Sequence, residues 1–245
     1  MQRHFTIVIP AYNCEPWVEK NLKSAINQDY SNYDVVYIDD ASTDSTLDRA
    51  KAVLASSSTS YSLIKNEVNR KALPNLYDAV YQSQEGTIIV ALDGDDWLLN
   101  NNVLTYLNEV YDQHDPWITA GSYIDNYQGI IHRPKVDNHF WQGIIRQKEW
   151  SLSHLRTFRR ELFTKIELKD FLDLDGSFFK YTWDRVIMYP MVEMAGQQKF
   201  HAILKPLYVY NRLNPISVDR VHRKDQLRIE QLISRKETYQ KVEEL

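Results

Sequence analysis

The chain has 245 residues, of which 43% are hydrophobic and 25% are charged. This composition excludes collagen, a coiled-coil rod and a mostly disordered chain, and the length predicts one domain, with or without an appended lobe. The 29 Lys and Arg residues against 33 Asp and Glu residues give a net charge of −4, so no overall positive field recruits nucleic acid and we expect none to bind.

Cysteine content and hydropathy indicate the redox compartment and whether a membrane segment is expected. Cys14 is the one cysteine, which excludes an intrachain disulfide and a thiolate metal cluster and fits the reducing cytoplasm. The longest apolar run, residues 88–92, is far shorter than the roughly 20 residues that span a bilayer. We therefore expect neither a signal peptide nor a transmembrane segment.

Short apolar runs alternate with segments of helical period in the first half of the chain. This alternation predicts an α/β fold with a mostly parallel central sheet flanked by helices. β-branched residues predict four strands, over residues 5–9, 35–38, 62–64 and 87–92. A first helix is expected over residues 18–26. A second is expected from the N-cap side chains of residues 42–44 towards Leu54, and a third begins near Pro74, because proline suits a first helical turn.

The second half has a less regular pattern. It predicts a helix over 103–111 and a return to the sheet over 117–124, followed by an irregular segment over 129–150. Helical stretches are expected over 159–166 and 183–194, a strand over 207–210, and a polar helical tail after residue 222.

Acidic and amide residues follow three of the predicted strands, in segments 10–13, 39–42 and 93–96. Ligands of an open parallel sheet bind at the carboxyl ends of its strands, so these side chains should meet in one site. Carboxylates gathered this closely repel one another unless a positive charge lies among them. Because oxygen donors predominate, Mn²⁺ or Mg²⁺ is preferred over zinc. Turn formation and helix capping are the alternative role of these acids, and Gly94 suits either a turn or the approach of phosphate.

Three motifs, IVIPAYN (7–13), IDDASTD (38–44) and LDGDD (92–96), resemble in order and spacing a family 2 glycosyltransferase with the GT-A fold. The resemblance is strong over the first hundred residues and thinner up to Tyr210. It implies a nucleotide diphosphate sugar donor, with a UDP-sugar expected. It also implies a donor site formed by Pro10, Ala11, Tyr12, Asn13, Glu15, Asp40, Asp93, Gly94 and Asp95.

The resemblance further implies a metal ligand in the third motif. Asp95 is the expected ligand, and Asp96 is the alternative or supporting one; the sequence leaves that choice open. Many family members carry an Arg-Asn pair on the helix after the third strand, but this chain has Leu-Pro-Asn over residues 73–75. Arg70 and Lys71, just upstream, are therefore expected to supply charge to the nucleotide, with ordinary loop solvation as their alternative.

Inverting family members need a base that takes the proton of the acceptor hydroxyl. Asp184 stands at the matching place, where Trp183 replaces the frequent acidic first member of the pair. Its alternative role is an Asp at a helix N-terminus, favoured by the helix dipole. Near the end of the chain, a basic segment resembles a part that closes over the donor, where His222 can reach the metal; an exposed helix start is the alternative.

We therefore expect one GT-A-type domain over 1–245, with a donor and metal half (1–120), an acceptor and base half (121–218) and a helical tail (219–245). The expected reaction is metal-dependent, inverting transfer of a hexose to a hydroxyl of a glycan or glycoconjugate acceptor. A nucleotidyltransferase and a non-catalytic nucleotide-sugar or glycan-binding module are the alternatives. The former usually has a Gly-rich basic loop, and residues 10–16 contain no Gly, Lys or Arg. Peripheral membrane contact and oligomeric state stay open.

Overall fold

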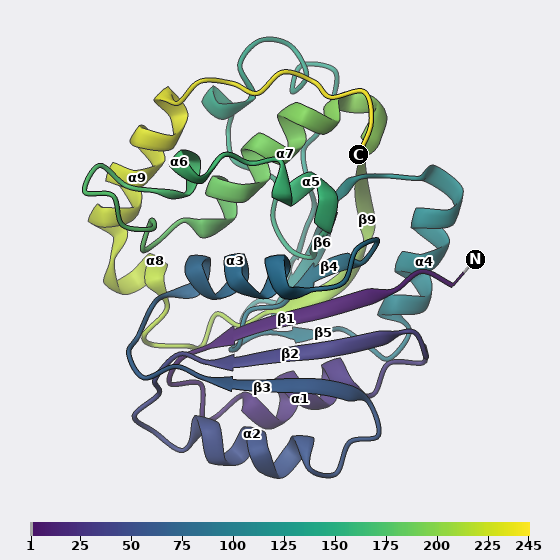
Figure 1. Cartoon of the computed structure of the whole chain (residues 1–245), viewed down its shortest axis with the longest axis vertical. Coiled ribbons are helices and arrows are strands. Elements are labelled where there is room, and N and C mark those ends of the chain that lie inside the picture. The colour runs from purple at the N-terminus through teal and green to yellow at the C-terminus, as the bar shows by residue number, and fades with distance from the viewer. Residues whose placement is uncertain (1) are drawn as a thin grey trace.

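The computed structural model describes residues 2–245, except for the side chains of residues 218 and 219. One mixed sheet runs through this part of the chain (Figure 1). Its parallel half consists of β3 (Ser60–Lys65), β2 (Tyr33–Asp39), β1 (Phe5–Ala11) and β4 (Ile88–Ala91), in this spatial order. The predicted α/β class and the first four predicted strands are confirmed.

The other half of the sheet changes direction. β8 (Arg156–Arg159) lies antiparallel between β4 and β6 (Ile118–Asp125), and β9 (Phe200–Tyr210) follows parallel to β6. The two-residue strand β5 (Trp97–Leu98) closes this edge, and β7 (Ile131–His132) pairs with β6. The sequence pattern predicted neither β8 nor β5, and it predicted only the last residues of β9.

Helices cover both faces of the sheet because its inner strands are apolar on both sides. Ile7 and Ile9 of β1 pack on one face against α1 (Val18–Ile26), α2 (Thr46–Leu54) and α4 (Val103–His114). Val8 points to the opposite face, where the core includes residues of α3 (Ala72–Gln82), α5 (Arg160–Thr164), α6 (Leu168–Phe171), α7 (Trp183–Lys199) and α9 (Arg223–Arg235). This alternation is the two-residue period of a strand.

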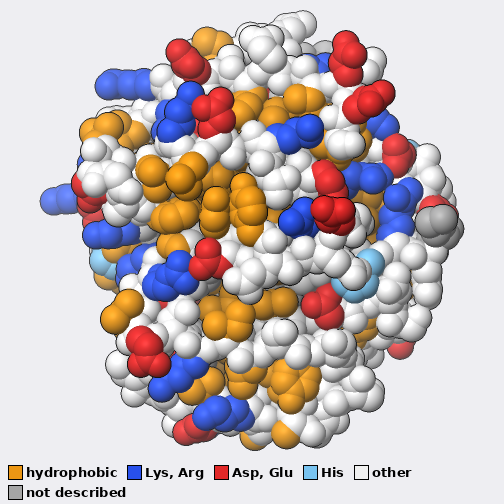
Figure 2. All heavy atoms as spheres, in the orientation of Figure 1, with side chains coloured by type: hydrophobic (Ala, Val, Ile, Leu, Met, Phe, Trp, Pro, Cys, Tyr) orange, Lys and Arg blue, Asp and Glu red, His pale blue; other side chains and the backbone are white. Residues whose placement is uncertain are grey.

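The surface carries both signs of charge, in keeping with the small net charge. Figure 2 shows positive and negative side chains interspersed over the face in view, with apolar side chains exposed between them. None of the helices formed by residues 2–245 has the length and apolar composition needed to cross a bilayer.

The C-terminal residues fold back onto α7. The helix of the expected tail ends at Arg235, and residues 236–245 contain no helix. The Val242 N–H donates to the Met194 carbonyl at 3.0 Å, and the Tyr239 hydroxyl donates to Asp170 Oδ2 at 2.5 Å. Tyr239 and Val242 also pack against the core, so apolar burial holds this segment in place.

A buried ion pair joins the irregular segment 129–150 to α7. Arg146 lies in the short helix η1 (Ile145–Gln147), and its Nε and Nη2 each donate to a different carboxylate oxygen of Glu193 at 2.8 Å. The backbone N–H of Tyr239 donates to the same carboxylate at 3.0 Å. One bidentate pair thus ties together η1, α7 and the end of the chain.

Replacing Arg146 with Met should destabilise the fold by about 3–5 kcal/mol, because it leaves a buried carboxylate without its counter-charge. Urea unfolding measures this loss. In the double variant Arg146→Met/Glu193→Met the uncompensated charge is also gone, so much of the stability should return. Equal loss in the single and double variants would contradict this account.

Candidate active site

A cavity of about 540 Å³ lies at the carboxyl ends of the parallel strands. Its wall combines the three motif loops with segment 154–156, the start of α7, and the segment after β9 that includes α8 (Val218–Val221). The structure places in this wall every predicted site residue except Glu15: Pro10, Ala11, Tyr12, Asn13, Asp40, Lys71, Asp93, Gly94, Asp95, Asp96, Asp184 and His222.

Glu15 instead serves the start of α2. Its carboxylate accepts from the Ser45 N–H at 3.3 Å and pairs with Arg49 at 3.2 Å. It lies in the loop after β1 but is not part of the cavity wall. The helix N-terminus explains this position, because a carboxylate there satisfies an N–H that the helix itself leaves unpaired.

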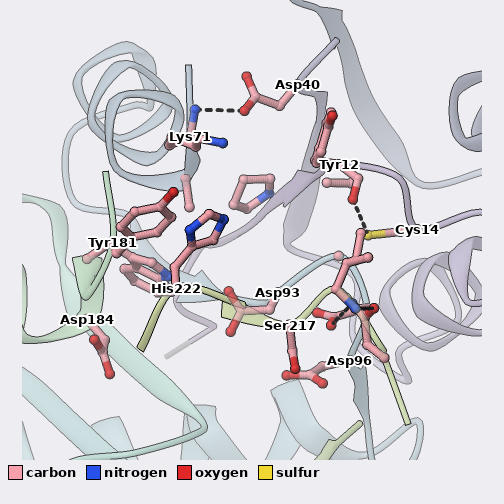
Figure 3. Close-up of a pocket in the computed structure, with 18 of the residues that line it drawn as sticks. Tyr12, Cys14, Asp40, Lys71, Asp93, Asp96, Tyr181, Asp184, Ser217 and His222 are labelled. Carbon is pink, nitrogen blue, oxygen red and sulfur yellow. Dashed lines mark hydrogen bonds between the residues drawn. The ribbon is translucent and has the colours of Figure 1, made fainter. Parts of the chain in front are cut away.

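Asp40 organises the loop after β3. Its carboxylate is almost fully buried and accepts from the backbone N–H groups of Arg70 and Lys71, each at 2.8 Å, and from Asn66 Nδ2 at 2.7 Å. Lys71 has a positive φ of 73°, and its Nζ lies 5.8 Å from the centre of the Tyr12 ring. Asp40 therefore brings a cation to the aromatic ring that follows β1 (Figure 3).

Gly94 allows the acidic loop to lie against the end of β1. A Cβ added at Gly94 would lie 2.6 Å from the Cβ of Ala11 and 2.9 Å from the carbonyl oxygen of Pro10. Such distances are far below ordinary van der Waals contact. Close packing between two motifs thus explains this glycine, independently of any bound phosphate.

Asp95 and Asp96 connect the same loop to the segment after β9. Asp96 is buried; the Tyr208 hydroxyl donates to its Oδ2 at 2.5 Å, and the Asn211 N–H donates to its Oδ1 at 2.7 Å. Burial raises the pKa of Asp96 well above its ordinary value. Asp95 accepts from Asn214 Nδ2 at 2.7 Å and is only partly buried.

Two further residues, His154 and Arg156, line the floor of the cavity, and the sequence analysis missed both. Arg156 is 3% exposed, and its Nη2 donates to Asp184 Oδ2 at 3.2 Å. Its Nη1 lies 3.2 Å from His154 Nδ1, which is itself 3.7 Å from Asp93 Oδ2. Burial, with a smaller effect of Arg156, holds the pKa of His154 well below its usual range, so this imidazole is neutral at neutral pH.

The surroundings of Asp93 strongly change the pKa of its carboxyl group. Burial raises its pKa to about 7; the nearby Arg156 opposes this rise, and Asp95 and Asp184 add to it. About a quarter of the side chain is exposed. Figure 3 shows Asp93 on the cavity floor between Asp184 and Asp96, below the imidazole of His222. Water and neighbouring groups both act on this carboxyl.

Two sets of donors can be considered for a metal ion. Ligand atoms of Asp93, Asp96 and His154 lie within 4.8 Å of one another. In that set, however, both oxygens of Asp96 already accept protein hydrogen bonds, and the Arg156 guanidinium lies beside His154 Nδ1. Arg156 thus already places one positive charge beside this set.

The other set consists of Asp95 and His222. His222 stacks on Tyr181 with ring centres 4.5 Å apart, and its Nδ1 lies 3.8 Å from Asp225 Oδ2. A carboxylate with an imidazole is a donor set that suits Mn²⁺.

The raised pKa of Asp93 predicts a pH-dependent stability. A carboxyl whose pKa in the folded state lies above its ordinary value of 3.8 destabilises the fold once it ionises. Stability should therefore fall as pH rises from about 4 to about 7. Between about pH 5 and about pH 8, metal-free wild type should lose about 1–2 kcal/mol relative to Asp93→Asn, a value reduced by solvent screening.

Urea unfolding at the two pH values, in the presence of EDTA, measures this difference. The exposed Asp48 on α2 provides the control variant Asp48→Asn, whose stability should follow that of wild type. Parallel pH curves for wild type and Asp93→Asn would show that Asp93 does not titrate in this range.

Comparison with known proteins gives the family. A sequence model of glycosyl transferase family 2 matches residues 6–178. Glycosyltransferase GlyA of Streptococcus pneumoniae is 26% identical over 118 residues, which are 48% of this chain and 16% of GlyA. The matched part spans less than half the length of the curated relatives.

Solved structures agree in fold. TarS of S. aureus in complex with UDP-GlcNAc has a TM-score of 0.67 at 18% identity, covering 94% of this chain and 65% of that one. Glucosyl-3-phosphoglycerate synthase of Mycobacterium tuberculosis, with Mn²⁺, UDP and glucosyl-3-phosphoglycerate, has a TM-score of 0.61 at 16% identity, covering 95% and 80%. Since the family's sequence model spans more than half of the chain, the protein belongs to glycosyl transferase family 2 and has the GT-A fold that its three motifs implied.

Proposed function

We propose that the protein is a metal-dependent inverting glycosyltransferase that moves a hexose from a UDP-sugar to a hydroxyl of a glycan or glycoconjugate. One observation carries the proposal: in a chain of this family, the three donor motifs and the carboxylate of Asp184 line the same cavity. A donor and an acceptor hydroxyl can therefore meet beside a candidate base, as a single displacement requires.

The proposed binding site for the donor nucleotide contains Tyr12, Lys71 and Asp40. The ring of Tyr12 offers a stacking face for a nucleobase, and the Lys71 ammonium offers a positive charge to the nucleotide. Asp40 fixes the loop that carries Lys71. The fold relative with bound UDP-GlcNAc supports a uridine nucleotide as the donor.

Asp95 and His222 are the proposed metal ligands, while Asp96 supports the loop from behind through Tyr208 and Asn211. A bound Mn²⁺ or Mg²⁺ would stabilise the negative charge of the departing diphosphate. The Mn²⁺ complex of glucosyl-3-phosphoglycerate synthase supports this choice of ion. The segment after β9 carries His222 and would fold over the donor from one side of the cavity.

Asp184 is the proposed general base. It is the second residue of α7, and about a fifth of its side chain is exposed to the cavity. In the proposed step the acceptor oxygen attacks the anomeric carbon as the bond to the diphosphate breaks. The hydroxyl proton passes to the Asp184 carboxylate, and the configuration at that carbon inverts.

Replacing Asp184 with Asn should lower transfer at least about 100-fold, because the amide cannot accept the proton. Binding of UDP and Mn²⁺, measured by calorimetry, should stay close to that of wild type. Transfer is measured as UDP released with a sugar nucleotide and acceptor; release of pyrophosphate would instead indicate a nucleotidyltransferase. The exposed Asp175 provides the control Asp175→Asn, and full transfer by Asp184→Asn would remove Asp184 as the base.

Replacing Asp95 with Ala should weaken Mn²⁺-dependent UDP binding at least about tenfold, since one oxygen ligand of the ion is lost. Calorimetry with Mn²⁺ and with EDTA separates the metal-dependent part of the affinity. Asp48→Ala, an exposed acid outside the cavity, is the matched control. The metal assignment fails if Asp95→Ala and wild type bind UDP equally well under both conditions.

A further inference from the structure

We propose that Arg156 is a positioning residue for Asp184: its guanidinium fixes the carboxylate in the orientation in which it receives the acceptor proton. The inference rests on the proposed function and adds to it a residue that none of the three motifs contains. It follows from the register of β8, the contacts of the guanidinium and the charges around it.

The sheet brings Arg156 to the cavity. β8 runs antiparallel to β4 with Arg156 opposite Ala91, two residues before Asp93, and on its other side Arg156 pairs with Ala120 of β6. The first residue of β8 therefore lies at the carboxyl end of β4, where the acidic loop begins. At 3% exposure the guanidinium is nearly removed from water.

The guanidinium contacts the first two residues of α7 at once. Its Nη2 donates to Asp184 Oδ2 at 3.2 Å, and its Cζ lies 5.0 Å from the centre of the Trp183 ring. Its Nη1 faces His154 Nδ1 at 3.2 Å, which fixes the rotation of the planar group. Only a flat, forked cation makes these three contacts together, so a lysine cannot replace it fully.

Two donors hold the Asp184 carboxylate. Arg156 binds Oδ2, and the Arg185 N–H donates to Oδ1 at 2.9 Å. The Arg185 contact comes from the next residue of the same helix, whereas Arg156 reaches the carboxylate from another part of the sheet. Loss of the guanidinium would leave the carboxylate free to turn away, and errors of about 1 Å in such geometry can cost about 100-fold in rate.

Charge supports the same role. The guanidinium pairs with Asp184 at 3.2 Å, and its other terminal nitrogen lies 3.2 Å from His154 Nδ1, which is 3.7 Å from Asp93 Oδ2, so one positive charge lies between the two carboxylates. Without it, repulsion would drive the two carboxylates apart. Arg156 thus keeps the proposed base close to the donor side of the cavity.

The test compares Arg156→Ala, Arg156→Lys, Asp184→Asn and the double variant Arg156→Ala/Asp184→Asn. Arg156→Ala should lower kcat at least about 100-fold with little change in the KM for the donor. Millimolar guanidinium chloride, far below denaturing concentrations, should restore at least about tenfold of that loss, whereas the same concentration of urea should not. Arg156→Lys should lie between Arg156→Ala and wild type.

Removing Arg156 in the Asp184→Asn background should lower kcat less than about threefold further, because Arg156 acts through Asp184. Arg3→Ala, which removes a partly exposed, ion-paired arginine at the amino ends of the strands, is the control for loss of an ion-paired arginine away from the cavity and should keep wild-type kcat.

The outcomes separate this inference from the proposed function. If wild type transfers sugar and Asp184→Asn transfers it at least about 100-fold more slowly, full kcat in Arg156→Ala, or additive losses in the double variant, overturns the positioning role alone. If wild type transfers no sugar from any donor, both proposals fall. Should Arg156→Ala not fold, Arg156→Lys decides: kcat reduced at least about threefold at unchanged donor KM supports the role, and wild-type kcat refutes it.

Discussion

The cavity depends on one buried positive charge among carboxylates that come from different parts of the chain. Asp93 follows β4, Asp184 begins α7, and Arg156 starts the strand that lies between β4 and β6. Like charges gathered in one cavity repel more strongly than they would in bulk water. From the sequence we expected a divalent cation to relieve that repulsion, but the protein itself supplies part of the compensation through Arg156.

This arrangement divides the cavity floor into two sides. On one side, Arg156, His154 and Asp93 form a compact group whose positive charge is already provided. On the other side, Asp95 contacts Asn214 of the segment after β9. Asp96 lies behind both and uses its two oxygens to attach that segment to the sheet. The acidic loop thus combines a structural carboxylate with carboxylates that remain near the ligand space.

The sequence predicted the parallel half of the fold because its strands are rich in β-branched residues, its inner strands β1 and β4 are apolar on both faces, and its helices have clear apolar stripes. It did not predict β8 or β5, since β8 (RTFR) has arginine at both ends instead of an apolar run and β5 has only two residues. The motif position of Glu15 also gave no sign that Ser45 and Arg49 bind its carboxylate. Arg156 was missed for a related reason. It reaches the cavity because β8 pairs with β4 at Ala91, and a local sequence pattern does not reveal such pairing.

The contact between Arg156 and α7 also accounts for the departure from the family pattern at Trp183. An acidic residue at that position would place a second carboxylate next to Asp184, and both would compete for one guanidinium. The Trp183 ring instead packs over the guanidinium, 5.0 Å from its Cζ, and brings no negative charge. Nη2 then has Asp184 as its carboxylate partner. A tryptophan before the aspartate therefore strengthens the pairing of Arg156 with Asp184, which is the contact that sets the direction of that carboxylate.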